Sequence, residues 1–429
     1  MHHEITQHDL TGGARLLAIR IPNTITYFWE SVFRAGYRFV GSEEYELPHL
    51  AEHLAFEGTK RYPDATAFKT EIERDGTYYN AATGYDTVSY MYSGGRAGLE
   101  RIIPIAMSQI YEPLYGDEQI SQEKAVIEQE MRRRQEDDSW RLGYLEMHAL
   151  LPQRNPDIAQ RIDNIAGISR QQLLDYHARC YGAANTDFVV AGDYSIAEIK
   201  RLVTQLNKEL ATHPAGENHV FEKPTFVAGG GRVLTFEPHR KQQSLFSLRF
   251  AQPGNDEQHQ AALRVMSVLL TGGLSPRLQR KARQQGLTYG IHASAGANHD
   301  LTTLTVRSQT SLDKLQPLVE LAIQELAALG AGDFIDEELE RAKGYYAGSM
   351  RRSYQTPAHY ADWYLDQFVA REELQSPEQR IAEIEAVDRA AIAAAYKEYV
   401  QTDTALLTLI GAGLGRRKAN FKRLLDQLA

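Results

Sequence analysis

The five residues from His49 to His53 read His-Leu-Ala-Glu-His, a pattern that constrains both the local fold and its chemistry. In a helix, residues i and i+4 lie on one face, so the two imidazoles can bind one metal ion. Glu52 shares this face and lies beside the metal. The order inverts the His-Glu-x-x-His motif of zinc proteases. The pattern therefore predicts a helix that holds a metal ion, with Glu52 as the general base of a metal-assisted hydrolysis.

The residues around this motif indicate that the helix packs against the protein core. Apolar side chains recur at i, i+3, i+4 and i+7, and Pro48 suits a first helical turn. This apolar stripe consists of Leu47, Leu50, Ala51 and Leu54. The alternative is a surface helix that carries two histidines by chance. We disfavour it, because polar groups beside a buried stripe are costly unless a ligand satisfies them.

A catalytic zinc ion usually takes three protein ligands, and a second helix offers the third. The segment 123–134 is rich in residues that favour helices. Glu123 and Glu130 are seven residues apart and share one face of such a helix, whereas Glu128 points away from both. This segment is therefore the best candidate for the third ligand.

Together, the two segments resemble the pitrilysin (inverzincin) family, which includes insulin-degrading enzyme and the mitochondrial processing peptidases, and in particular its short two-domain, processing-peptidase-like branch. That family has a zinc-binding glutamate 77 residues after the second histidine, and 53 + 77 = 130 is glutamate here. It also has a supporting glutamate seven residues earlier. The resemblance implies that His49, His53 and Glu130 hold one Zn2+ per chain, and that Glu123 supports catalysis by orienting one histidine.

A β-hairpin is predicted shortly after the histidine motif. Residues 77–83 and 87–92 are rich in Tyr, Thr and Val, and they flank the turn sequence Gly84-Tyr85-Asp86. The first strand resembles the one that, in the family, runs beside the zinc and pairs with the substrate backbone. The resemblance implies that substrate binds at Asn80, Ala81, Ala82 and Thr83. For Asn80, an ordinary polar position in a strand is an equal alternative.

The chain is internally doubled. The segment 168–193, a helix opened by a cap residue and an arginine and followed by an apolar strand, has a counterpart 219 residues later. Between the halves, residues 213–231 are rich in Gly and Pro and lack periodicity. We therefore predict a zinc-bearing domain at 1–212, a linker at 213–231 and a second domain at 232–429.

Strands, hairpins and long helical runs in each half predict an α+β fold with mainly antiparallel sheets flanked by helices. The family resemblance implies the same: two homologous halves that enclose a cleft and together form half of a clamshell. A chain of this length would then pair with another to complete the clamshell. The expected assembly is a dimer, either of two copies or with a related subunit.

The second half has no histidine motif, so the metal chemistry is assigned to the first half and substrate gripping to the second. Tyr289, after a basic segment, resembles the family's arginine/tyrosine pair, which helps to hold the substrate carbonyl. The usual arginine position is Ala282 here, so Arg283 is the candidate and Arg280 the alternative. A basic helix end that interacts with the helix dipole is another interpretation of these arginines.

Composition limits the partners of the chain. Its 429 residues carry a net charge of −9, which offers no basic surface for nucleic acid and no attraction to an anionic membrane. A single cysteine, Cys180, excludes an internal disulfide. The N-terminal residues do not resemble a signal peptide, and no run of 18 apolar residues occurs. We therefore expect a cytoplasmic protein whose partner is a peptide.

The predicted function is that of a zinc-dependent metalloendopeptidase, which hydrolyses internal bonds of peptides or unfolded polypeptide segments in an enclosed cleft. The alternative is a non-catalytic or half-catalytic subunit of a heterodimeric peptidase, whose partner supplies the arginine/tyrosine pair. Substrate identity, cleavage-site preference, pathway and the native metal stay open, because nitrogen and carboxylate ligands admit several metals.

Overall fold

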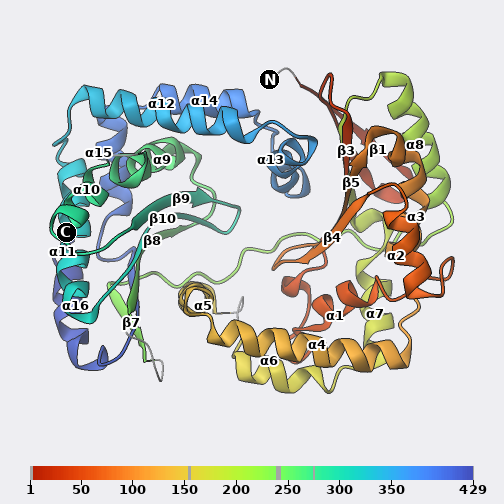
Figure 1. Ribbon diagram of the computed structural model, residues 1–429, viewed down its shortest axis with the longest axis horizontal. Helices are drawn as coiled ribbons and strands as arrows, with labels where there is room; N and C mark the ends of the chain where they lie inside the picture. The colour runs from red at the N-terminus through yellow and green to blue at the C-terminus, as the bar shows by residue number, and fades with distance from the viewer. Residues whose placement is uncertain (1–2, 153–155, 238–242, 274–275, 429) are drawn as a thin grey trace. The chain divides into compact units, whose positions relative to one another are not determined.

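The computed structural model is an α+β protein whose chain divides into two units (Figure 1). The described residues are 3–152, 156–237, 243–273 and 276–428. The first unit comprises residues 1–133, 156–222 and 353–375. The second comprises residues 134–155, 223–352 and 376–429. Each unit has one mainly antiparallel sheet flanked by helices, so the predicted fold class is confirmed.

The first unit is built on a six-stranded sheet with the order β1-β2-β6-β3-β5-β4. Neighbouring strands are antiparallel except β2 and β6, which are parallel. Because β4 is the last strand, one of its edges pairs with no other strand of the described chain. The strands are β1 (Glu4–Asp9), β2 (Arg15–Arg20), β3 (Thr26–Phe33), β4 (Tyr78–Thr83), β5 (Val88–Gly95) and β6 (Thr186–Gly192).

Helices cover both faces of this sheet. One face packs on a large apolar core that includes Trp29 and Phe33 of β3 and Leu50 and Leu54 of the motif helix. The other face is covered by α13. The helices of this unit are α1 (Leu47–Leu54), α2 (Ala65–Glu73), α3 (Leu99–Tyr111), α4 (Asp117–Glu136, up to Arg133), α6 (Ile158–Ile165), α7 (Arg170–Cys180), α8 (Ile196–Leu210) and α13 (Pro357–Val369).

The second unit has a five-stranded sheet with the order β7-β11-β8-β10-β9, in which only β7 and β11 are parallel. This arrangement repeats β2-β6-β3-β5-β4 of the first unit. β6 begins at Thr186 and β11 at Ala405, which is the interval of 219 residues in the sequence. The strands are β7 (Arg232–Phe236), β8 (Ser244–Pro253), β9 (Ile291–Ala297), β10 (Leu301–Thr310) and β11 (Ala405–Ile410).

The helices of the second unit pack on its sheet around a core of their own. They are α5 (Asp138–Leu150), α9 (Glu257–Thr271), α10 (Arg277–Gln284), α11 (Leu312–Gly330), α12 (Asp336–Ser353), α14 (Pro377–Glu385), α15 (Arg389–Tyr399) and α16 (Lys418–Leu425). The sequence predicts one helical run from Glu123 to Leu151, but Asp137 caps a new helix, α5, within it.

The two units are not continuous in sequence, whereas the predicted domains, 1–212 and 232–429, are. The difference concerns two helices. α5 precedes residue 212 but belongs to the second unit, whereas α13 follows residue 232 but belongs to the first. The linker predicted at 213–231 divides between the units after Glu222. Its first part is packed on the first unit, where the ring of His219 stacks on that of Phe39.

Burial of apolar side chains explains why α5 and α13 each belong to the unit formed mainly by the other half of the sequence. α13 places Tyr364 and Phe368 on a sheet face that includes Leu17 and Val189. α5 ends with Leu150, which is buried in a cluster with residues of the second sheet. A sheet has two faces, and each unit covers its second face with a helix from the other half of the sequence.

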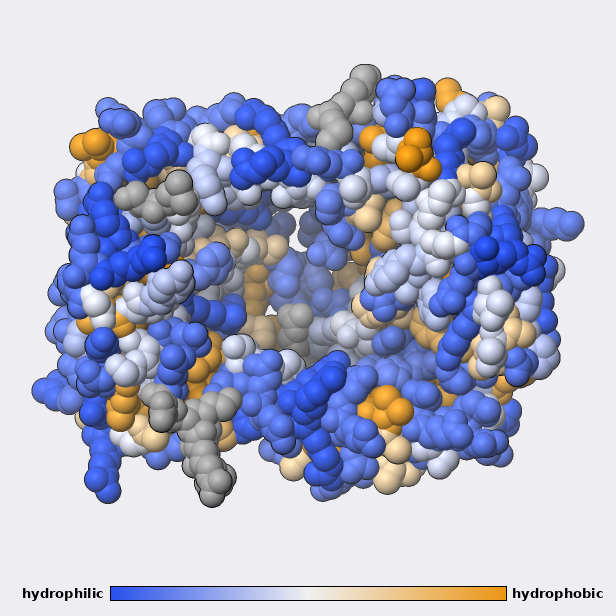
Figure 2. All heavy atoms as spheres, viewed as in Figure 1, coloured by the Kyte–Doolittle hydropathy of each residue, from blue (hydrophilic) through white to orange (hydrophobic). Residues whose placement is uncertain are grey.

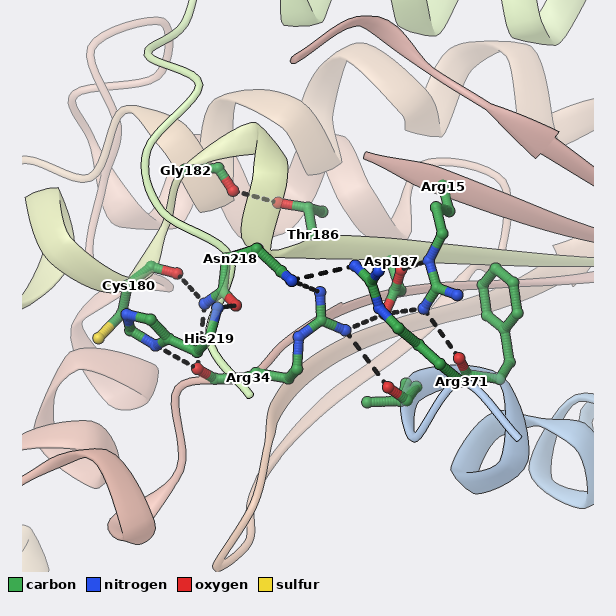
Figure 3. Close-up of polar contacts among 12 residues, drawn as sticks. Arg15, Arg34, Cys180, Gly182, Thr186, Asp187, Asn218, His219 and Arg371 are labelled. Carbon is green, nitrogen blue, oxygen red and sulfur yellow. Dashed lines mark hydrogen bonds and ion pairs between the residues drawn. The ribbon is translucent and has the colours of Figure 1, made fainter. Parts of the chain in front are cut away.

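A polar network fastens α13 and the linker to the first sheet (Figure 3). Asp187 of β6 accepts hydrogen bonds from Arg15, at 2.8 Å, and from Arg34. Arg15 also donates to the carbonyl oxygen of Phe368, and Arg34 donates to Oδ1 of Asn218 in the linker at 2.9 Å. One buried carboxylate therefore holds two arginines that bind segments distant in sequence.

The molecular surface in Figure 2 is mostly hydrophilic, and the apolar side chains on this face form small separate groups. Among the described residues, no helix combines the length and the apolar character that crossing a membrane requires.

Candidate metal centre

The histidine motif forms α1, as the sequence predicts. Leu50 and Leu54 are buried in the core, and the helix packs against α7 and β4. His49 and His53 lie on one face, with ring centroids 4.7 Å apart and ring planes at 89°. One ligand atom from each of His49, Glu52 and His53 lies within 4.8 Å of the others. The helix therefore brings two imidazoles and one carboxylate to a single point.

α4 supplies two carboxylates to the same point, and it lies beside α1 in Figure 1. Oε2 of Glu123 is 2.7 Å from Nδ1 of His53, and Oε2 of Glu130 is 3.8 Å from Nε2 of His49. Buried Ile127 fixes this face of α4 toward the core. Glu128 points elsewhere and forms an ion pair with a neighbouring arginine. The spacing of seven residues thus has the predicted geometric result.

Each histidine uses Nδ1 for a carboxylate of the protein. His53 donates to Glu123, and His49 lies 3.2 Å from Oε2 of Glu46. With Nδ1 as the donor, Nε2 carries the lone pair that binds a metal. Both rings are therefore held in the tautomer that metal binding requires.

Glu46 is a residue of this site that was not predicted from the sequence. It lies three residues before His49 and is 1% exposed. Arg161 of α6 donates to its other oxygen at 2.6 Å. Burial alone would raise the pKa of Glu46, but the hydrogen bond with His49 and the charge of Arg161 hold this pKa below its ordinary value. The spacing from His49 hints at this contact, whereas Arg161 is too distant in sequence to be recognised.

The donor set fits a divalent cation such as zinc. Burial lowers the pKa of His53, but its hydrogen bond with Glu123 and the nearby charges of Glu52 and Glu130 raise it overall. Glu52, Glu123 and Glu130 thus leave an excess of negative charge around the two imidazoles, whereas the charge of Glu46 is paired with Arg161. Two nitrogen ligands and a carboxylate are a common set for catalytic zinc.

The predicted substrate strand is β4, the edge strand that packs beside α1. Its residues alternate between exposed and half-buried, so Asn80 and Ala82 point to the opposite face from Ala81 and Thr83. Thr83 donates a hydrogen bond of 2.9 Å to Oε2 of Glu52. The structure therefore joins Thr83 directly to the site, whereas Asn80 is an exposed residue of the edge strand.

Tyr289 and Arg283 belong to the second unit, where they lie together. The Arg283 guanidinium carbon is 5.0 Å from the centre of the Tyr289 ring, and this ring is 87% exposed. Ala282, at the usual position of the family's arginine, is buried. Arg283 is therefore an arginine that pairs with Tyr289, and the contribution of this pair to catalysis stays a prediction.

Family models match most of the chain. The model described as insulinase (peptidase family M16) matches residues 32–150, which include the motif helix and α4. The model described as peptidase M16 inactive domain matches residues 167–346. An uncharacterized zinc protease of Mycobacterium leprae is 26% identical over 359 residues, which are 81% of this chain and 78% of that protein.

Solved structures have the same fold. A protease from Helicobacter pylori superposes with a TM-score of 0.84 at 17% identity, over 95% of this chain and 99% of that one. The periplasmic protease PqqL from Escherichia coli gives a TM-score of 0.82 at 20% identity, over 99% of this chain and 50% of that one.

Proposed function

The chain belongs to peptidase family M16, and on this premise we propose that it is a zinc endopeptidase that hydrolyses internal bonds of peptides or unfolded segments. The observation that carries the proposal is the convergence of α1 and α4 on one point. There, His49, His53 and Glu130 would hold the zinc ion, and Glu52 lies beside them. The naming of related proteins as zinc proteases supports the choice of metal.

A zinc ion bound by these ligands would polarise the scissile carbonyl and make water more acidic. Glu52 would take a proton from the attacking water and pass it to the nitrogen of the leaving amine. The proximity of Glu52 to His49 and His53 supports this role. Glu123 would orient His53 by accepting a hydrogen bond from its Nδ1, since such partners fix the ring of a metal-bound histidine.

The substrate would bind as an added strand on the edge of β4. An extended peptide can hydrogen-bond to a strand edge through its backbone, which gives affinity with little dependence on sequence. The six residues of β4 would align such a peptide beside α1. This binding mode favours unfolded segments, because a folded protein seldom offers an extended backbone.

Substitution of Glu52 by Gln tests the function directly. The variant should keep one zinc ion per chain, measured by elemental analysis, but lose cleavage of a quenched fluorescent peptide. Cleavage near the wild-type rate by a zinc-loaded Glu52→Gln variant would refute the proposed role. Wild-type protein that binds zinc but cleaves no member of a peptide library would instead favour the non-catalytic subunit.

We also propose that two chains associate. This chain matches half of the PqqL chain, so a pair of such chains would equal its length. Sedimentation of the purified protein would give the mass of the assembly. A monomer that is inactive alone and active with a related subunit would favour the heterodimer over the homodimer. Cytoplasmic localisation stays a prediction.

A further inference from the structure

The two histidines of the site are supported in different ways. His53 bonds to Glu123, whose side chain is 18% exposed. His49 bonds to Glu46, whose side chain is 1% exposed and bonded in turn to Arg161. Since a buried charge is stable only when it is compensated, Glu46 depends on Arg161 for its position and its ionised form.

Two aromatic rings lie beside the Arg161 guanidinium. Its guanidinium carbon lies 4.5 Å from the centre of the Tyr45 ring and 5.5 Å from that of Tyr37. These two rings are stacked, 4.5 Å apart at an angle of 1°. Arg161 itself is 4% exposed and comes from α6, so the arrangement unites α6, α1 and the segment before α1. The guanidinium has little freedom to move, and the carboxylate it binds is equally fixed.

We propose that Glu46 and Arg161 form a charge-neutral support that positions His49 as a metal ligand and sets the zinc affinity of the site. The inference rests on the proposed function, because it assumes that His49 binds zinc. Glu46 gives the Nδ1 proton of His49 a fixed acceptor, and Arg161 prevents that carboxylate from rotating away. Partners of this kind typically contribute about 10–100-fold to metal affinity.

A double substitution separates this role from a purely structural one. Glu46→Met with Arg161→Met removes both charges but keeps apolar bulk, and such replacements of buried pairs often leave a fold stable. We expect an unchanged melting temperature for the metal-free protein and a roughly 10–100-fold weaker zinc Kd, measured by competition with a fluorescent chelator. An unchanged Kd would overturn the proposal.

The matched control is a buried arginine–glutamate pair in the other unit. Arg277 and Glu325 are 8% and 3% exposed and form an ion pair of 3.3 Å. Their double replacement by Met should leave the zinc Kd at the wild-type value. An equal loss of affinity in this control would mean that general loosening, not the support of His49, explains the effect.

A rescue variant keeps the test decisive if the double Met protein fails to fold. Glu46→Gln with Arg161→Met is uncharged but retains an amide oxygen that can accept a hydrogen bond from Nδ1 of His49. It should bind zinc more weakly than wild type, because Arg161 no longer fixes the side chain at position 46, but more tightly than a His49→Ala variant. Affinity as weak as that of a His49→Ala variant would overturn the proposal. Wild-type protein that binds no zinc would refute the proposed function instead.

Discussion

The hydroxyl group of Thr83 donates a hydrogen bond of 2.9 Å to Oε2 of Glu52. Thr83 is the last residue of β4, the proposed substrate strand, and Glu52 lies on α1. The bond therefore links the strand that would bind a peptide to the proposed general base. From the sequence, Thr83 is predicted to contact substrate, whereas its observed partner indicates a positioning role.

Replacement of Thr83 by Val should lower kcat and leave KM and zinc content unchanged. A hydrogen bond to a charged group contributes about 1.5–3 kcal/mol, which corresponds to roughly 10–100-fold in rate if the bond acts in the transition state. Peptide cleavage measured over a range of substrate concentrations would separate the two constants. Thr83→Ser should restore kcat, because serine retains the hydroxyl. A rise in KM at unchanged kcat would instead support substrate contact.

Glu130 should be essential for zinc, and its neighbour Glu128 offers a matched control on the same helix. Glu130→Gln removes a charged ligand, so we expect a loss of zinc affinity beyond the roughly 10–100-fold typical of supporting residues. Glu128→Gln should bind zinc like the wild type, because Glu128 pairs with Arg132 on another side of α4. Equal zinc affinity in both variants would contradict the assignment of Glu130.

The pairing of Arg283 with Tyr289 leads to a prediction about the reaction intermediate. If the Tyr289 hydroxyl donates to the developing oxyanion, Tyr289→Phe should lower kcat by about 10²–10³-fold, the usual effect of losing such a donor. Zinc content should not change. Arg283→Met should act in the same direction more than Arg280→Met, because Arg283 contacts the Tyr289 ring. A Tyr289→Phe variant with the wild-type kcat would show that the Tyr289 hydroxyl does not stabilise the oxyanion.

Local and periodic features were predictable from the sequence. The motif helix follows from apolar spacing around His49 and His53, and Glu130 from a fixed interval. The doubling appears in the sequence as a constant offset and in the structure as a repeated strand order. These features depend on short-range patterns or on a known spacing, and both are visible in one sequence.

Features that depend on tertiary packing were not predictable. The spacing of three residues between Glu46 and His49 hints at their contact, but Arg161, 115 residues away from Glu46, cannot be recognised as its partner from the sequence. The exchange of α5 and α13 is similar, because an apolar stripe such as Tyr360, Tyr364 and Phe368 indicates burial but not which sheet it covers. A prediction from chain order therefore assigns α5 and α13 to the wrong units, because each helix packs on a sheet face that is otherwise uncovered.

One buried acid in the first unit connects stability to pH. Glu30 of β3 is 2% exposed, and its Oε2 makes no hydrogen bond within the part of the chain that the structure describes. Burial, with smaller contributions from the charges of Asp362 and Asp366 on α13, raises the pKa of this carboxyl to about 7, although a hydrogen bond with Ser89 opposes the rise. The folded protein therefore holds a proton on Glu30 at pH values where the unfolded chain does not.

This difference predicts that stability falls as the pH rises. Below about pH 4.5, Glu30 is protonated in both the folded and the unfolded state, and its contribution to the free energy of unfolding is fully present. This contribution is lost as the pH rises to about 7. A shift from 4.5 to about 7 corresponds to at most about 3 kcal/mol of unfolding free energy. Glu30→Gln should remove this component, so that urea unfolding gives a more stable variant at pH 8 and near-equal stabilities at pH 5. A variant less stable than wild type at pH 8 would show that ionised Glu30 is a favourable part of the fold.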